Sequence, residues 1–230
     1  MIDKVSKNII LLRHGEFDSS SKSIDITGFM QAMIVAKYLR DNKFPLPSAF
    51  IASTEKRTVQ MSKIISSSLT RKAIPVYQER MIYGDALYGI EDAVNNPERA
   101  LKDSNFIICV SHQPGLESSF KRCGIEEKDY QSKLKMKEPF IRVSDTFLLT
   151  APTWEEMLAL GGNIQIKHLI SPASIRFYDK PGMSGIKQTF ERNFTNGDIE
   201  KIPLLLEEMR NNQKLRESMI GILNSSVNTL

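Results

Sequence analysis

The segment Asn8-Ile9-Ile10-Leu11-Leu12-Arg13-His14-Gly15-Glu16 decides the fold class of this chain. Its apolar run is typical of a strand that is covered on both faces, as in a parallel sheet. The run stops at Arg13 and His14, and Gly15 lets the backbone turn or approach a ligand closely. Because ligands bind at the carboxyl ends of strands in open α/β sheets, the segment predicts a buried strand that ends in a functional site.

Similar apolar runs recur along the 230 residues and alternate with amphipathic stretches. This alternation predicts an α/β fold with a doubly wound, mostly parallel sheet flanked by helices. We expect strands at 8–12, 49–52, 73–77, 105–110, 146–150 and 164–170, and helices at 27–41, 54–69, 91–101, 114–124, 154–160, 203–210 and 215–227. Between them we expect an irregular stretch at 79–89, a polar, charge-rich insertion at 121–142 and little periodicity at 174–197.

The alternating pattern ends at Pro172, which predicts an α/β domain over 1–172 and a mostly helical C-terminal extension over 173–230. The last expected helix carries Leu215, Met219 and Ile222 on one face, and such a face needs an apolar partner. We expect the extension to pack either on the core or on a second subunit. The second arrangement would make the protein a homo-oligomer.

The composition excludes several classes of protein. No apolar stretch reaches the roughly 18 residues that a membrane-spanning helix needs, and the run at 9–12 is too short for a signal-peptide core. We therefore expect a cytoplasmic protein with no membrane partner. The net charge of +4 suits acidic or phosphorylated partners, but no basic stripe with interleaved aromatic residues indicates a nucleic-acid partner.

The sequence also gives no sign of a cofactor. The chain has three histidines and two cysteines, and their spacing matches no metal-binding pattern. Neither a phosphate-binding P-loop nor a dinucleotide fingerprint is present. We expect neither a metal nor an organic cofactor.

Three polar clusters directly follow expected strands. They are Arg13-His14-Gly15, the segment from Ser53 to Arg57, and Ser111-His112-Gln113-Pro114-Gly115. If these strands are parallel, both histidines and both arginines meet at one edge of the sheet.

These residue types suit phosphoryl transfer. A neutral imidazole can attack phosphorus, and the guanidinium group presents a fixed fork of donors that fits phosphate oxygens. Any one of these residues alone would more often be a solvated surface side chain. Their shared placement at strand ends favours a phosphate site in which Arg13, Arg57 and His112 surround His14.

Four motifs in the expected order resemble the histidine phosphatase superfamily, which has the phosphoglycerate-mutase-like fold. Residues 11–16 (Leu-Leu-Arg-His-Gly-Glu) look like its signature, and residues 53–60 (Ser-Thr-Glu-Lys-Arg-Thr-Val-Gln) resemble its Ser-x-x-x-Arg-Thr-x-Gln segment. Residues 27–32 (Thr-Gly-Phe-Met-Gln-Ala) resemble a shortened form of its Thr-x-x-Gly-x-x-Gln-Ala helix start. Residues 111–116 (Ser-His-Gln-Pro-Gly-Leu) are similar to the Gly-His-Asn-Pro-Gly-Leu of bacterial phosphohistidine phosphatases. The resemblance covers 8–172.

The resemblance implies a metal-independent phosphatase in which His14 is phosphorylated transiently while Arg13, Arg57 and His112 hold the phosphate. The neighbouring residues expected to bind substrate or phosphate are Gly15, Glu16, Ser53 and Gln113. The substrate would be a phosphomonoester or phosphoramidate, on a small molecule or a phosphoprotein.

The proton donor to the leaving group is the open question. Glu79-Arg80 with Tyr83-Gly84 resembles the loop that supplies the acid in the mutases, but the match needs an inserted residue. Residues around Leu87 and Glu91 resemble the phosphohistidine phosphatase branch instead. Glu79 is the first candidate, with a plain surface carboxylate as the equal alternative, and Glu16 is a second candidate.

Two other functions stay open at this point. A mutase-type phosphotransferase would transfer the phosphoryl group between sugar acids rather than to water. A catalytically silent phosphate-binding or scaffold protein would keep the pocket and use the extension as its interaction surface. We expect substrate choice to depend on 79–89, 121–142 and the extension, where the family patterns fail.

Overall fold

The structure, a computed structural model, describes residues 6–159, 163–175, 177–194 and 197–227. Its centre is a six-stranded sheet in the order β3-β2-β4-β1-β5-β6. The strands are β1 (Lys7–Arg13), β2 (Ala49–Ala52), β3 (Val76–Gln78), β4 (Phe106–Ser111), β5 (Thr146–Ala151) and β6 (Gln165–Ile170). The first four in sequence run parallel, and β5 is antiparallel to both of its neighbours.

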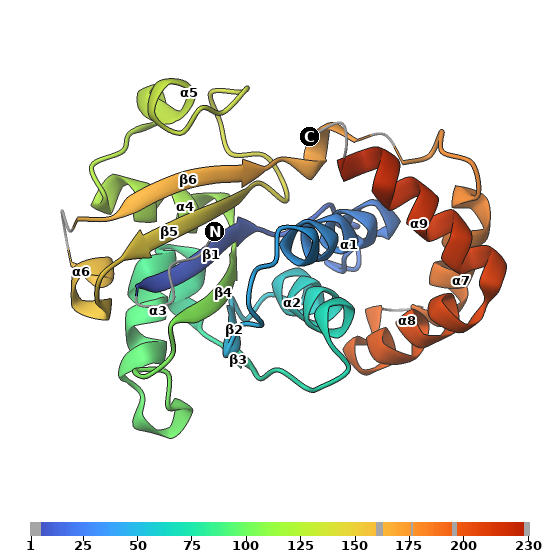
Figure 1. The fold of residues 1–230 in the computed structure, drawn as a ribbon, viewed down its shortest axis with the longest axis horizontal. Helices are drawn as coiled ribbons and strands as arrows, with labels where there is room; N and C mark the ends of the chain where they lie inside the picture. Colours follow the sequence, from blue (N-terminus) through green and yellow to red (C-terminus); the bar gives the residue numbers. More distant parts are fainter. Residues whose placement is uncertain (1–5, 160–162, 176, 195–196, 228–230) are drawn as a thin grey trace.

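Helices cover both faces of this sheet (Figure 1). One face packs against α1 (Ile26–Asp41) and α2 (Lys56–Leu69), and the other against α3 (Ala86–Asn95), α4 (Gln113–Arg122) and α6 (Trp154–Leu158). The remaining helices are α5 (Tyr130–Lys133), α7 (Met183–Asn193), α8 (Ile202–Asn211) and α9 (Gln213–Val227). The predicted doubly wound, mostly parallel α/β fold is confirmed.

The three strands that precede the polar clusters are neighbours in the sheet. Arg13 of β1 pairs with Ser111 of β4, and Ala52 of β2 pairs with Val110. Backbone hydrogen bonds continue just past the strand ends, from His14 N to Ser111 O at 3.0 Å and from Ser53 N to Val110 O at 3.2 Å. Because the strands are parallel, their carboxyl ends meet at one edge and bring the clusters together.

The C-terminal helices share an apolar cluster with α1 and α2. In Figure 1, α7, α8 and α9 (orange to red) lie beyond these two helices, on their side away from the sheet. The buried residues they contribute include Ile186, Phe190, Leu205, Met209, Met219 and Ile222. The apolar face of α9 therefore has its partner within the same chain.

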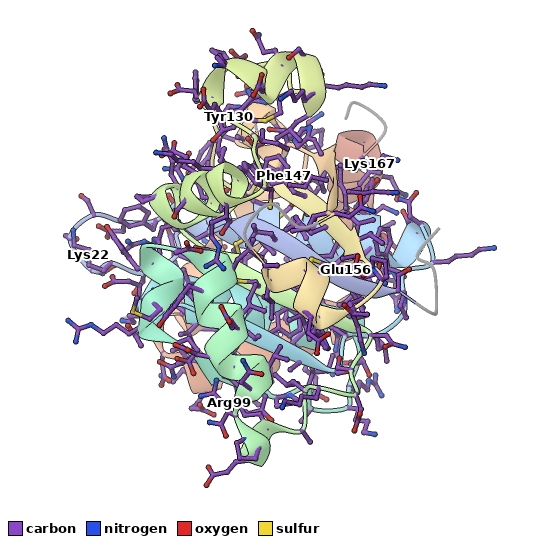
Figure 2. All side chains as sticks on the ribbon, turned by 90° about the vertical axis from the view of Figure 1, so that its left-hand side faces the viewer. Lys22, Arg99, Tyr130, Phe147, Glu156 and Lys167 are labelled. Carbon is purple, nitrogen blue, oxygen red and sulfur yellow. The ribbon has the colours of Figure 1, made fainter. Side chains whose placement is uncertain are left out.

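The 121–142 segment is charged at its surface but anchored by apolar side chains. Tyr130 and Ile141 are buried in the cluster beneath it. The Phe120 ring lies 5.8 Å from the Tyr130 ring and 4.8 Å from the Phe147 ring, both of which are labelled in Figure 2. The segment is charge-rich as expected, but its anchoring in the core was not predicted, because sparse apolar residues without regular spacing carry no periodic signal.

Two predicted elements between β2 and β4 are displaced. The helix predicted at 91–101 was wrong in its limits, since α3 spans Ala86–Asn95 and begins inside the stretch expected to be irregular. Asp85 caps this helix by accepting from Tyr88 N at 3.1 Å, and a 3₁₀ turn, η1 (Arg80–Tyr83), precedes it. The strand predicted at 73–77 also begins later, since β3 is Val76–Gln78, directly after Pro75, which lacks a backbone donor.

The prediction of little periodicity at 174–197 was wrong for its middle part, where α7 forms. The helix begins after Gly182, whose φ of 82° is left-handed, and buries Met183, Ile186 and Phe190. These three positions have the i, i+3 and i+7 spacing of one helical face, but they are few and lie among polar residues. Residues 160, 176, 195 and 196 of the predicted segments lie outside the described residues.

Of the helices in the described ranges, none has the length and apolar character to cross a membrane.

Adjacent leucines in α8 test the packing of the C-terminal helices. Leu205 is 0% exposed and Leu204 is 64% exposed. We expect Leu205→Ala to lower the free energy of unfolding by about 2–5 kcal/mol, because it leaves a cavity in the apolar cluster that α8 shares with the neighbouring helices. Leu204→Ala should change it by less than about 0.5 kcal/mol. Urea titration followed by circular dichroism measures both, and equal effects would contradict this packing.

Candidate active site

The turn that carries His14 is fixed by its contact with the start of α1. A Cβ atom at Gly28 would lie 2.0 Å from the backbone oxygen of Glu16, so only glycine allows this approach. Gln31 on the same helix accepts a hydrogen bond from Glu16 N at 2.9 Å. The Thr-Gly-Phe-Met-Gln-Ala motif therefore holds the backbone of the Arg13–Glu16 turn.

His14 is held in one tautomer by its two hydrogen bonds. Its Nδ1 lies 2.8 Å from the carbonyl oxygen of Gly15, which can only accept, so Nδ1 carries the proton. Its Nε2 accepts from Nε of Arg57 at 3.1 Å and therefore carries a lone pair. The ring is 4% exposed, so the pocket presents a buried imidazole with an unprotonated Nε2.

Arg57 also contacts the second histidine of the site. Its Nη2 donates to Nδ1 of His112 at 3.2 Å, which leaves the proton of that neutral ring on Nε2. Within the described part of the chain, His112 Nε2 is buried and has no hydrogen-bond partner. The third branch of the guanidinium, Nη1, pairs with Glu55 at 3.0 Å.

Both histidines are strongly biased towards the neutral form. Burial lowers the pKa of His14 to about 4, with the positive charges of Arg57 and Arg13 acting in the same direction and the hydrogen bond to Gly15 opposing them. Burial also lowers the pKa of His112 to about 3, helped by His14, Arg57 and Arg13. At neutral pH the pocket thus has its positive charge on the arginines and an unprotonated Nε2 on His14.

Arg13 reaches the pocket from the end of β1. Its Nη1 donates to Oε1 of Gln113 at 2.9 Å and to the carbonyl oxygen of Ile141 at 2.7 Å. Gln113 in turn donates to Glu117 at 2.7 Å, so its amide is oriented at both ends. In the described structure, Nε of Arg13 is buried and makes no hydrogen bond.

The structure places the other predicted binding residues around this pocket. The N–H of Gly15 points to Sδ of Met61 at 3.0 Å, and the buried Ser53 accepts from Thr58 Oγ1 through its backbone oxygen at 2.8 Å. Ser53 therefore shapes the turn before α2. Glu16 is exposed at the rim, where partial desolvation and then Asp25 raise its pKa while Arg13 opposes them.

Glu79 is not joined to the other four predicted catalytic residues. Its carboxylate forms an ion pair with Arg99 Nη1. Across the described ranges, no hydrogen bond or ion pair links that carboxylate to His14, His112 or either pocket arginine. The structure thus gathers Arg13, His14, Arg57 and His112 and leaves Glu79 facing another partner.

Three neighbours of the pocket were not foreseen. Glu55 pairs with Arg57, the ring of Phe17 lies 4.7 Å from the Arg57 guanidinium carbon, and the ring of Tyr83 lies 4.4 Å from that of His112. The position of Phe17 directly after Glu16 was a usable signal. Tyr83 comes from η1, about 30 residues away from His112 in sequence, and only the packed fold reveals it.

The described residues include no group of histidine, cysteine, aspartate or glutamate side chains that could hold a metal ion.

Two solved structures of similar architecture are both SixA proteins assigned as phosphohistidine phosphatases. The SixA of Nakamurella multipartitia aligns with a TM-score of 0.52 at 15% identity, over 72% of this chain and 98% of its own. The SixA of Agrobacterium tumefaciens aligns with a TM-score of 0.52 at 17% identity, over 72% and 98%. The chain has the phosphoglycerate-mutase-like fold. This confirms, for the fold, the resemblance carried by the sequence motifs.

Sequence comparison adds nothing to this likeness, since no protein-family model and no curated protein matches the chain. Because the two SixA structures share only 15% and 17% of their residues with this chain, the likeness shows a common architecture and nothing about chemistry. The chemistry of this phosphoglycerate-mutase-like chain must therefore be argued from its own residues.

The hydrogen bonds of His14 predict its nuclear magnetic resonance signature. At pH 7 the nitrogen-15 spectrum should show Nδ1 protonated and Nε2 unprotonated, because Gly15 O accepts and Arg57 donates. Since the pKa is lowered to about 4, the ring should stay neutral as the pH falls from 8 to 5. An Nε2–H tautomer, or a titration near the ordinary value of about 6.5, would contradict this arrangement.

Proposed function

We propose that this chain is a metal-independent phosphatase that acts through a phosphohistidine on Nε2 of His14. The observation that carries the proposal is the bridging contact of Arg57, whose Nε and Nη2 donate to His14 and His112 at 3.1 and 3.2 Å. This contact presents a nucleophilic lone pair beside fixed cationic donors, which is what attack on a phosphoryl group requires.

In the first step, the phosphoryl oxygens accept hydrogen bonds from Arg13, Arg57 and the free N–H of His112. The N–H at Nε of Arg57 turns from Nε2 of His14 to a phosphoryl oxygen, and the released lone pair on Nε2 attacks phosphorus to form a new N–P bond. The bond from phosphorus to the leaving oxygen or nitrogen breaks, and its electron pair stays with the leaving group, which takes a proton. Positive charge develops on the imidazole, and the Gly15 carbonyl stabilises it through Nδ1–H.

In the second step, water attacks the phosphohistidine. The N–P bond breaks, its electron pair returns to Nε2, and inorganic phosphate leaves. The water proton passes to the carboxylate that donated a proton in the first step. The cycle consumes one water molecule, and its products are phosphate and the dephosphorylated group.

We assign the proton transfers to Glu16 in preference to Glu79. Glu16 adjoins the nucleophile in sequence, and partial burial together with the charge of Asp25 raises its pKa, with Arg13 opposing them. The Glu79 carboxylate is instead engaged by Arg99. An exposed carboxyl group at the rim can also exchange its proton with solvent between the two steps.

Replacement of histidines tests the nucleophile. We expect His14→Ala to reduce hydrolysis of p-nitrophenyl phosphate by at least about 10³-fold, because no other lone pair replaces Nε2. His168→Ala is the matched control, since His168 lies on β6 against Phe147. Phosphate release measures both, and mass spectrometry under alkaline conditions should find phosphohistidine at position 14 of the wild type alone. Residual activity in His14→Ala, or loss of wild-type activity on treatment with a chelator, would contradict the mechanism.

Replacement of the two carboxyl groups tests the acid. We expect Glu16→Gln to lower kcat for phenyl phosphate by about 10²-fold or more, because its leaving group needs a proton. The effect on p-nitrophenyl phosphate should be much smaller, since that leaving group departs readily as an anion. Glu79→Gln should affect both substrates alike. The opposite pattern, with leaving-group dependence confined to Glu79→Gln, would assign the acid to Glu79.

A further inference from the structure

An aromatic ring lies beside each of the two histidines, on the side away from the other histidine. The Phe17 and His14 ring centroids are 5.3 Å apart, those of His14 and His112 are 4.9 Å apart, and Tyr83 follows at 4.4 Å from His112. We call Phe17, His14, His112 and Tyr83 the aromatic row. Its two inner rings are buried, whereas Phe17 is half-buried and Tyr83 is 47% exposed.

Phe17 is held in place by a hairpin that is tied to α2. Phe17 pairs with Ile24 in an antiparallel bridge, and Asp18 N donates to Ser23 O at 2.9 Å. Ile24 N then donates to Oε1 of the buried Gln60 at 2.8 Å, and Gln60 lies one helical turn after Arg57. Lys22, close to the hairpin tip, lies at the outer edge of the molecule (Figure 2). The hairpin and Arg57 are therefore both attached to α2, and this keeps the Phe17 ring over the Arg57 guanidinium.

Tyr83 is held by the close packing of η1 on the start of α4. Ile82 is fully buried, and its carbonyl oxygen accepts from Oγ of Ser111 at 2.5 Å. A Cβ atom at Gly115 would lie 2.4 Å from the same oxygen, so the two backbones meet closely. This contact fixes the neighbouring Tyr83 against His112, and its ring stays exposed although it is apolar on both faces.

The two outer rings are the solvent-exposed members of the aromatic row. A substrate that places its phosphorus at His14 Nε2 comes from solvent, and Phe17 and Tyr83 are the members of the row that solvent reaches. Flat apolar surfaces attract planar rings by stacking and offer little to a flexible, hydroxylated chain. The carboxylate of Glu55 lies beside Arg57 and would repel a second anionic group on the substrate.

We infer that Phe17 and Tyr83 determine specificity by selecting substrates whose phosphoryl group is carried on a planar aromatic ring. The inference rests on the proposed phosphatase function and narrows its substrate class to aryl phosphates. Sugar phosphates and phosphoglycerates, which lack such a ring and carry further polar or anionic groups, are poor substrates for this pocket.

Phosphonates separate ring binding from leaving-group reactivity, because their carbon–phosphorus bond is not hydrolysed. The measurement is the inhibition constant of phenylphosphonate and of methylphosphonate, with p-nitrophenyl phosphate as substrate and the full chain as enzyme. We expect phenylphosphonate to bind the wild type about fivefold or more tightly. Phe17→Leu and Tyr83→Leu should each reduce this preference at least about twofold and leave methylphosphonate binding within about threefold.

Two further variants are controls. Phe17→Tyr keeps a ring and should keep the preference. Tyr88→Leu removes an exposed ring from α3, 45% exposed against 47% for Tyr83, and should also keep the preference. Circular dichroism establishes that each variant is folded, and the wild-type ratio stands as a test even if one leucine variant does not fold.

The outcomes separate the inference from the proposed function. A wild-type preference for phenylphosphonate below about fivefold, or a preference that both leucine variants retain, overturns the role of the two rings. Hydrolysis of p-nitrophenyl phosphate by the same wild type would leave the phosphatase proposal intact. A wild type that neither hydrolyses p-nitrophenyl phosphate nor binds methylphosphonate overturns both.

Discussion

Arg57 donates to both histidines of the pocket, and the chemistry of the site depends on this shared contact. A guanidinium group cannot accept a hydrogen bond, so each histidine must turn a lone pair towards it. The remaining nitrogens then both carry protons: Nδ1 of His14 donates to the Gly15 carbonyl, whereas the N–H at Nε2 of His112 has no hydrogen-bond partner among the described residues. One side chain thus fixes the tautomers of both rings. Arg57 reaches both rings because β2 and β1 flank β4 in parallel register.

Much of the fold could be predicted because continuous apolar runs and polar strand ends are local signals. The strand 49–52 matches β2 in full, and the runs at 8–12 and 105–110 fall within one residue of β1 and β4. Elements whose apolar residues are sparse could not be predicted in this way. Helix α7 begins after a left-handed glycine and buries few side chains, and α3 begins directly after Asp85, within a stretch of residues typical of loops.

The pocket was predictable as a set of residues but not as a set of contacts. Arg13, His14 and His112 end strands, and Arg57 lies on the first turn of the next helix, so parallel topology alone brings them close. Glu79 could not be placed, because its partner Arg99 comes from a separate turn and has no signal in the sequence. Tyr83 and Phe17 were overlooked for a related reason. An aromatic residue in a loop is equally compatible with core packing, and only its exposure beside His112 and Arg57 distinguishes the two.

Gln60 connects regions that the chain keeps far apart. Its amide oxygen receives Ile24 N from the hairpin beside the pocket, and its amide nitrogen donates to Gly197 O in the C-terminal part at 2.6 Å. A carboxylate or an aliphatic side chain at this buried position could not serve both partners. We therefore expect the hairpin and the C-terminal helices to exchange their amide protons through a common opening event, since both depend on α2 remaining folded. Unfolding of the C-terminal helices would then loosen the hairpin beside the pocket, because the Gln60 amide bonds to both regions.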